Sequence, residues 1–148
     1  MKDTLINLFD RDLNKLKNEL KAYRKEENIW KISGEIANSG GTLALHLIGN
    51  LNFFIGTVIG NSGYVRDREA EFADRGVPRD QMLENIDNTI QVVTRAILEF
   101  PEDRFGDTYP HVVFKEPMTY EYFMFHLLGH LNYHLGQVNY HRRLLDNG

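Results

Sequence analysis

Cysteine is absent from the sequence, so neither a disulfide framework nor a thiolate metal ligand is available to this protein. Proline is scarce, and three of its four residues fall between positions 101 and 118, where they predict a loop. No run approaches the roughly 20 apolar residues that span a bilayer, so we expect no membrane partner. The first residues lack the apolar core of a secretion signal, which favours a cytoplasmic location.

An excess of basic charge is also missing. The chain has 17 Lys and Arg against 21 Asp and Glu, and its formal net charge is -4. Surfaces that follow a phosphate backbone need clustered basic side chains, so we expect no nucleic-acid partner. The hydrophobic fraction of 42% is ordinary for a globular protein, and 148 residues fit one domain that spans positions 1–148.

Four long segments repeat apolar residues at spacings of three and four, the pattern of amphipathic helices. Ser39 and Thr119 are suitable N-caps for the second and last of them. The second segment is apolar around its circumference, so we expect it to be central or to face a second subunit. With no convincing set of strands, the prediction is an all-α four-helix bundle. The expected helices span residues 4–24, 38–60, 80–100 and 119–147.

The connection over residues 61–79 is long for a compact domain, a feature that often accompanies function. Within it, residues 64–69 are compatible with a short helical turn. The segment from 101 to 118 holds one extended-looking piece, Val112 to Phe114, which we interpret as a possible short strand.

Histidine is concentrated on the last predicted helix. At about 100° per residue, His126, His130, His134 and His141 fall on one narrow stripe that borders the apolar face. Two histidines four apart can direct imidazole nitrogens at one ion, and the pair chosen here is His130 with His134. We assign the remaining ones, His111, His126 and His141, to structure or surface.

A third ligand must come from another segment, and His46 is the candidate because it lies midway along an otherwise apolar helix. Asn50, one turn further on, and Gln137, next to His134, are candidates for orienting the ligands. The competing interpretation is a metal-free bundle whose histidines are hydrogen-bonded. Residues 131–133 lack the glutamate of a zinc-protease motif, which disfavours peptidase chemistry.

The last helix, with His130, His134 and then Gly136-Gln137, resembles the closing helix of the DinB-like superfamily, and His46 matches that family's third ligand. The resemblance covers essentially the whole chain. It implies an up-down-down-up bundle with a long connection between helices 2 and 3, a His46, His130 and His134 site for zinc or nickel, and a homodimer.

The same resemblance implies, as one function, a metal-dependent transferase that activates a small thiol at an open metal position; a hydrolase would use water there. Arg66, Asp67 and Arg68 are candidates for anchoring an anionic substrate, although a solvated charged turn is the plainer interpretation. The alternative function is a non-catalytic metal-binding or stress-related bundle with a structural or vestigial site.

Overall fold

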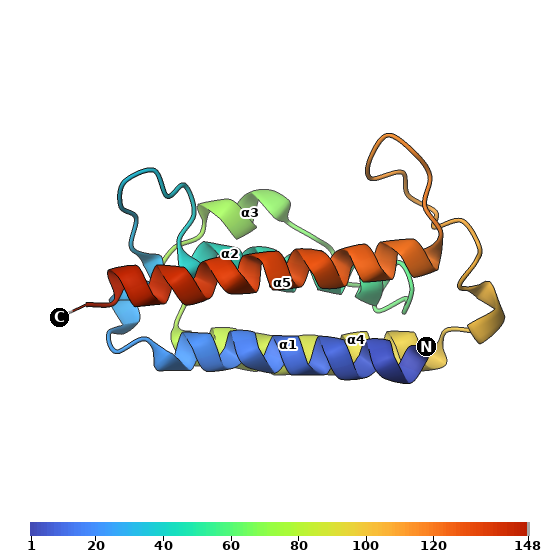
Figure 1. Cartoon of the computed structure of the whole chain (residues 1–148), viewed down its shortest axis with the longest axis horizontal. Coiled ribbons are helices and arrows are strands. Elements are labelled where there is room, and N and C mark those ends of the chain that lie inside the picture. The colour runs from blue at the N-terminus through green and yellow to red at the C-terminus, as the bar shows by residue number, and fades with distance from the viewer. Residues whose placement is uncertain (148) are drawn as a thin grey trace.

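The computed structural model describes residues 1–147, which are all-helical and contain no strand (Figure 1). Two layers are visible: α1 lies against α4, and α2 lies against α5. Contacts of α1 with α5 and of α2 with α4 join the layers. The five α-helices are α1 (Lys2–Ala22), α2 (Gly40–Leu51), α3 (Arg68–Ala73), α4 (Arg79–Glu99) and α5 (Tyr120–Leu145).

Helices α1 and α4 form because each presents one apolar stripe to the core. Leu5, Phe9 and Leu13 are buried along α1, and Met82 and Ile86 continue the same core from α4. Burial of each such side chain contributes roughly 1.5–3 kcal/mol relative to exposure. The helices predicted over residues 4–24 and 80–100 are therefore present, with ends shifted by one or two residues.

Helix α2 begins where the sequence indicates, because the Ser39 hydroxyl accepts a hydrogen bond from the Thr42 amide. Almost every residue of α2 is buried. The helical path continues beyond Leu51 as a π-helical segment over Asn52–Thr57. One extra residue in that turn leaves the Phe54 carbonyl to accept a hydrogen bond from the buried Tyr109 hydroxyl. The second predicted helix is thus confirmed, but its final turns are not α-helical.

Two local predictions were wrong. Residues 112–114 form no strand, and the nearest pairing is an isolated bridge between Thr108 and Thr119. Three prolines and an exposed Phe114 leave this segment as a loop. The short helix of the long connection begins at Arg68, later than the turn expected at 64–69, because the Asp67 side chain caps the amide of Ala70.

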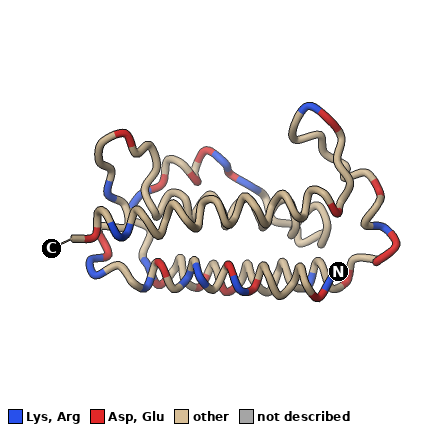
Figure 2. The backbone as a smooth tube through the Cα atoms, viewed as in Figure 1, with Lys and Arg blue, Asp and Glu red and all other residues tan. Residues whose placement is uncertain are grey.

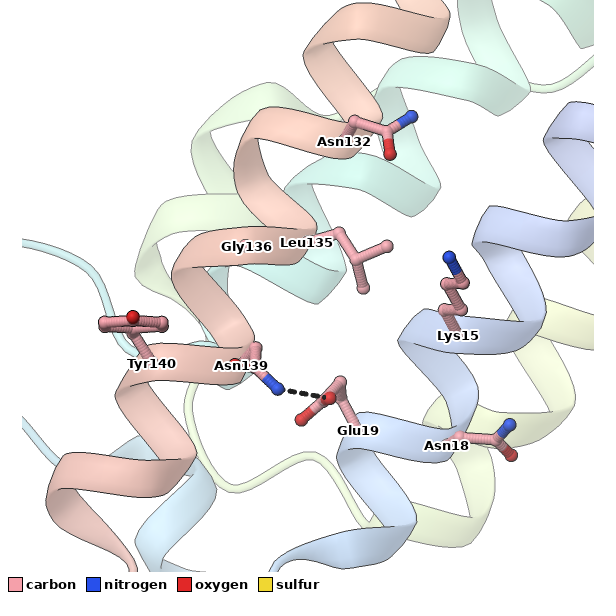
Figure 3. A pocket seen from close by; sticks show the side chains of 8 residues that line it. All are labelled: Lys15, Asn18, Glu19, Asn132, Leu135, Gly136, Asn139 and Tyr140. Atoms are coloured by element: carbon pink, nitrogen blue, oxygen red, sulfur yellow. Dashed lines mark hydrogen bonds between the residues drawn. The ribbon is translucent and has the colours of Figure 1, made fainter.

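Polar contacts join α1 to α5. Asn139 donates a hydrogen bond of 2.7 Å to Glu19 across a hollow of about 390 Å³ (Figure 3). Arg142 pairs with the same carboxylate. Deeper in the interface, the fully buried Asp12 accepts from Asn132 and from Arg11. These polar groups hold the two helices in one register.

Two of the long helices, α2 and α5, carry little charge. Helix α2 has no charged residue, and α5 carries charge only in its first and last turns (Figure 2). In the described part of the chain, no helix has both the length and the apolarity needed to cross a membrane.

Candidate metal centre

Three imidazoles from two helices meet at a partly buried point. His46 lies on α2, while His130 and His134 lie one turn apart on α5. Nε2 of His130 is 3.3 Å from Nε2 of His46 and 3.1 Å from Nε2 of His134. One nitrogen of each ring lies within 4.8 Å of the others, so the group can hold a metal ion. The structure brings together the three histidines that the sequence singles out.

The outer nitrogen of His46 faces a carboxylate. Nδ1 lies 3.0 Å from Oε1 of Glu71, a residue of α3 that is only 6% exposed. Arg66 donates to both oxygens of the same carboxylate, at 2.9 and 3.0 Å. Burial alone would raise the pKa of Glu71, but the hydrogen bonds from His46 and Arg66 outweigh it and hold the pKa below its ordinary value. Glu71 is therefore an ionised acceptor, and Nδ1 of His46 carries the proton.

His134 is fixed in the same tautomer by a different partner. Its Nδ1 lies 2.7 Å from the amide oxygen of Gln137, which can only accept. The proton is therefore on Nδ1 here as well. In both His46 and His134 the unprotonated Nε2 then points its lone pair at His130.

His130 occupies the middle of this arrangement. Burial lowers its pKa to about 4, and the neighbouring His134 and His46 add to the effect, so the ring is neutral near pH 7. Its Nδ1 is buried and has no hydrogen-bond partner among residues 1–147. Two lone pairs aimed at a third nitrogen are favourable only around a cation or a shared proton.

The donor set fits a divalent metal. Tetrahedral zinc with bonds of 2.0–2.1 Å separates its ligand atoms by about 3.3 Å, close to the two short nitrogen distances here. Metal-ligating histidines usually donate their other ring N–H to a carboxylate or carbonyl oxygen, as His46 and His134 do. Three protein ligands leave at least one position for another molecule.

The other predicted site residues lie at different positions around the three histidines. Asn50 is 6% exposed and lines a cavity beside His46 and His130, and Arg68 lines the same cavity. Arg66 lines it too, with its guanidinium committed to Glu71. Asp67 caps α3 and is not among the residues that line the cavity. Only Gln137, of the two expected orienting residues, contacts a ring of the three histidines through a hydrogen bond.

A family model described as "Protein of unknown function (DUF1572)" matches residues 3–148. The chain belongs to this family. No curated protein matches it with significance. Function in this DUF1572 chain must therefore be argued from the site itself.

Glu71 is the functional residue that sequence reasoning missed in this DUF1572 member. Its carboxylate reaches His46 because position 49, one turn after His46, is glycine: a Cβ there would collide with the Glu71 carboxyl. Two sequence features could have pointed to Glu71: a glycine in the second helix, and an acidic residue on a short helix within the long connection. Neither feature alone identifies the pairing.

The remaining histidines lie apart from the three. His141 is buried: its Nε2 donates to the Lys31 carbonyl at 2.8 Å and its Nδ1 accepts from the Tyr23 hydroxyl at 2.6 Å. His126 stacks on Phe123 and lines the cavity. His111 packs against the ring of Phe53. The structural assignment made for His141 agrees with these contacts.

Proposed function

We propose that His46, His130 and His134 hold a divalent cation, zinc or nickel, and that the protein is a metal-dependent transferase acting on a small thiol. The observation that carries the proposal is the convergence of three Nε2 atoms, with Nδ1 of His46 and of His134 each against an acceptor oxygen; these contacts favour the tautomers that leave the Nε2 lone pairs free. When bound, such a cation lowers the pKa of a thiol or water at its open position.

The residues of the chain supply the rest. Glu71 and Gln137 keep two imidazoles in the ligating tautomer. The cavity that reaches His46 and His130 has room for a second reactant beside the metal. The resemblance to the DinB-like superfamily supports the thiol in preference to water. The up-down-down-up four-helix bundle that this resemblance implies is supported by the way α1, α4, α2 and α5 pack in a ring.

The first experiment measures metal content and transfer separately. Protein purified without a histidine tag is analysed for zinc and nickel, and the metal-loaded protein is then incubated with an electrophile and bacillithiol, glutathione or coenzyme A. We expect one metal per chain and loss of thiol matched by conjugate. Full metal content with no conjugate from any of the three thiols would overturn the transferase, and hydrolysis of the electrophile instead would indicate a hydrolase.

A structural metal is the competing proposal, favoured by the fact that the ligands come from two helices. A cation at this point would tie α2 to α5 in the way a cross-link does. In that case His130→Ala lowers the melting temperature, and no thiol or electrophile affects the metal. A change in the spectroscopic signal of Co²⁺-substituted protein when a thiol is added would exclude a purely structural metal.

We also propose that two copies pair through the outer face of α5. Tyr133 and Tyr140 are each 67% exposed there, and the middle of the helix is uncharged (Figure 2). Exposed aromatic patches of this kind mark interaction surfaces. Sedimentation should give a dimer for the natural chain and a monomer for Tyr133→Glu. A monomer for both would refute the pairing.

A further inference from the structure

A cavity of about 370 Å³ opens beside His46 and His130. It lies between α2 and α5, and the segments around Arg66 and Phe114 form two of its sides. Its volume falls at the lower end of the range typical of small-molecule sites. The cavity is distinct from the hollow between α1 and α5 in Figure 3, where polar groups such as Glu19 and Asn139 already bond to each other.

One wall of the cavity is aromatic. Phe54 and Phe123 meet edge to face with centroids 5.1 Å apart, and Phe114 packs against His126 at 4.8 Å. Phe114 remains 53% exposed at this cavity. An aromatic lining with a partly exposed ring suits a ligand with a flat apolar ring, which would cover the exposed part of Phe114.

A residue that lines the cavity has a buried acceptor without a donor. Asn50 is 94% buried, since its relative exposure is 6%, and its Oδ1 makes no hydrogen bond within residues 1–147. Leaving a buried oxygen unpaired is costly, so such atoms normally meet a protein, water or ligand donor. A ligand that places an N–H or O–H against Asn50 would satisfy it.

At the edge of the cavity, one exposed arginine pairs with no carboxylate in the described chain. Arg66 gives Nε and Nη2 to Glu71, so its charge is balanced by that buried carboxylate. Arg68 lines the same cavity and pairs with no carboxylate in the described chain; its guanidinium lies over the Phe72 ring at 5.0 Å. A single guanidinium fork suits a carboxylate, whereas a dianionic phosphate usually collects more than one cation.

We propose that this cavity binds a small aromatic carboxylic acid bearing a hydroxyl or N–H group. The carboxylate pairs with Arg68, the ring packs against Phe54, Phe114 and Phe123, and the donor meets Asn50. The inference rests on the proposed function only for the role of this acid as the second reactant. Binding itself requires the cavity and no metal.

Three matched compounds separate the contributions in calorimetric titrations of the full chain with a chelator present. The probes are 3-phenylpropanoate, its neutral analogue 3-phenylpropanamide, and 2-hydroxy-3-phenylpropanoate, which adds one O–H donor. We expect the acid to bind at least about tenfold more tightly than the amide, because its charge-assisted hydrogen bond to Arg68 is stronger than the bond a neutral amide can make. The hydroxy acid should bind more tightly again.

Two variants assign the contacts. Arg68→Gln should make acid and amide equal, while Arg95→Gln, an exposed arginine of α4, serves as the matched control and should change nothing. Asn50→Leu should abolish the advantage of the hydroxy acid and leave 3-phenylpropanoate unaffected. Equal binding of acid and amide by the natural protein, or binding of neither, would overturn the proposal.

The design also distinguishes this inference from the proposed function. Acid binding in chelator with no metal uptake afterwards would refute the metal centre and leave the cavity assignment in place. One metal per chain with no acid binding would refute the cavity assignment and leave the metal centre in place. Circular dichroism of each variant confirms that a lost interaction is not a lost fold.

Discussion

Nδ1 of His46 donates a hydrogen bond of 3.0 Å to Glu71, a residue 25 positions further along the chain. This contact joins α2 to α3 and decides which nitrogen of His46 is free. Because Arg66 holds the same carboxylate from the other side, the acceptor is ionised and oriented before any ligand arrives. The long connection thus contributes to the site without supplying one of the three converging imidazoles.

Glu71→Gln should weaken metal binding by about 10–100-fold, the usual effect of removing a partner of a ligating histidine. The amide keeps the shape of the side chain but loses the charge that pairs with Arg66 and stabilises the Nδ1–H tautomer of His46. Competition with a chelator of known zinc affinity measures the change. Glu69→Gln, at an exposed position of the same helix, is the control. Equal metal affinities for the two variants would show that Glu71 does not support metal binding.

Gly49→Ala tests the packing that brings Glu71 to His46. Alanine normally stabilises a helix by about 1 kcal/mol relative to glycine, but here its Cβ would occupy the place of the Glu71 carboxyl. We expect the single substitution to lower the melting temperature and metal affinity. In a Glu71→Ala background the same change should be neutral or stabilising. A double-mutant cycle with no coupling between positions 49 and 71 would contradict the contact.

The sequence predicts the helices and the pair of His130 and His134 for one physical reason: both depend on positions along a single helix. Apolar spacing reports which face of α5 is buried, and the four-residue spacing of His130 and His134 follows from the same geometry. His46 was reachable because a polar ring in an apolar helix needs a partner. The contact of its Nδ1 with Glu71 was not predictable.

Glu71, Asn50 and the cavity depend instead on how separate segments meet. Glu71 reaches His46 only because α3 packs on α2 at Gly49, which no periodicity encodes. The segment from 112 to 114 shows the opposite error, since β-branched and aromatic residues predicted a strand although no neighbouring strand exists in residues 1–147 to pair with it. Strand propensity expresses tertiary context more than backbone preference.

Tyr23→Phe should destabilise the protein by about 1–3 kcal/mol, because it leaves Nδ1 of His141 as a buried acceptor without a donor. The opposite nitrogen donates to the Lys31 carbonyl, so the ring cannot change tautomer without losing that bond. Urea denaturation gives the free energy of unfolding. Tyr133→Phe, at an exposed position of α5, should change it by less than about 0.5 kcal/mol. Equal stability for the two variants would show that this buried pair contributes nothing.

Acid should destabilise the metal-free protein. Burial lowers the pKa of His130 to about 4, and it also lowers the pKa of His134 and of His141, so all three bind protons less readily in the folded state than in the unfolded chain. In the unfolded chain they take up protons near pH 6.5. Between these values the unfolded state binds more protons, so stability falls as the pH drops below about 6.5. His130 alone contributes up to about 2 kcal/mol of this loss by pH 4.5.

Urea unfolding in chelator at pH 7, 6 and 5 measures this dependence, and His130→Leu should make it shallower because one of the groups no longer titrates. His111→Gln, at an exposed position outside the three-histidine group, is the control and should keep the natural slope. With zinc present the natural protein should lose stability more steeply on acidification, since protons compete with the metal for the same nitrogens. An identical slope for His130→Leu and the natural chain would mean that His130 is not held neutral by its surroundings.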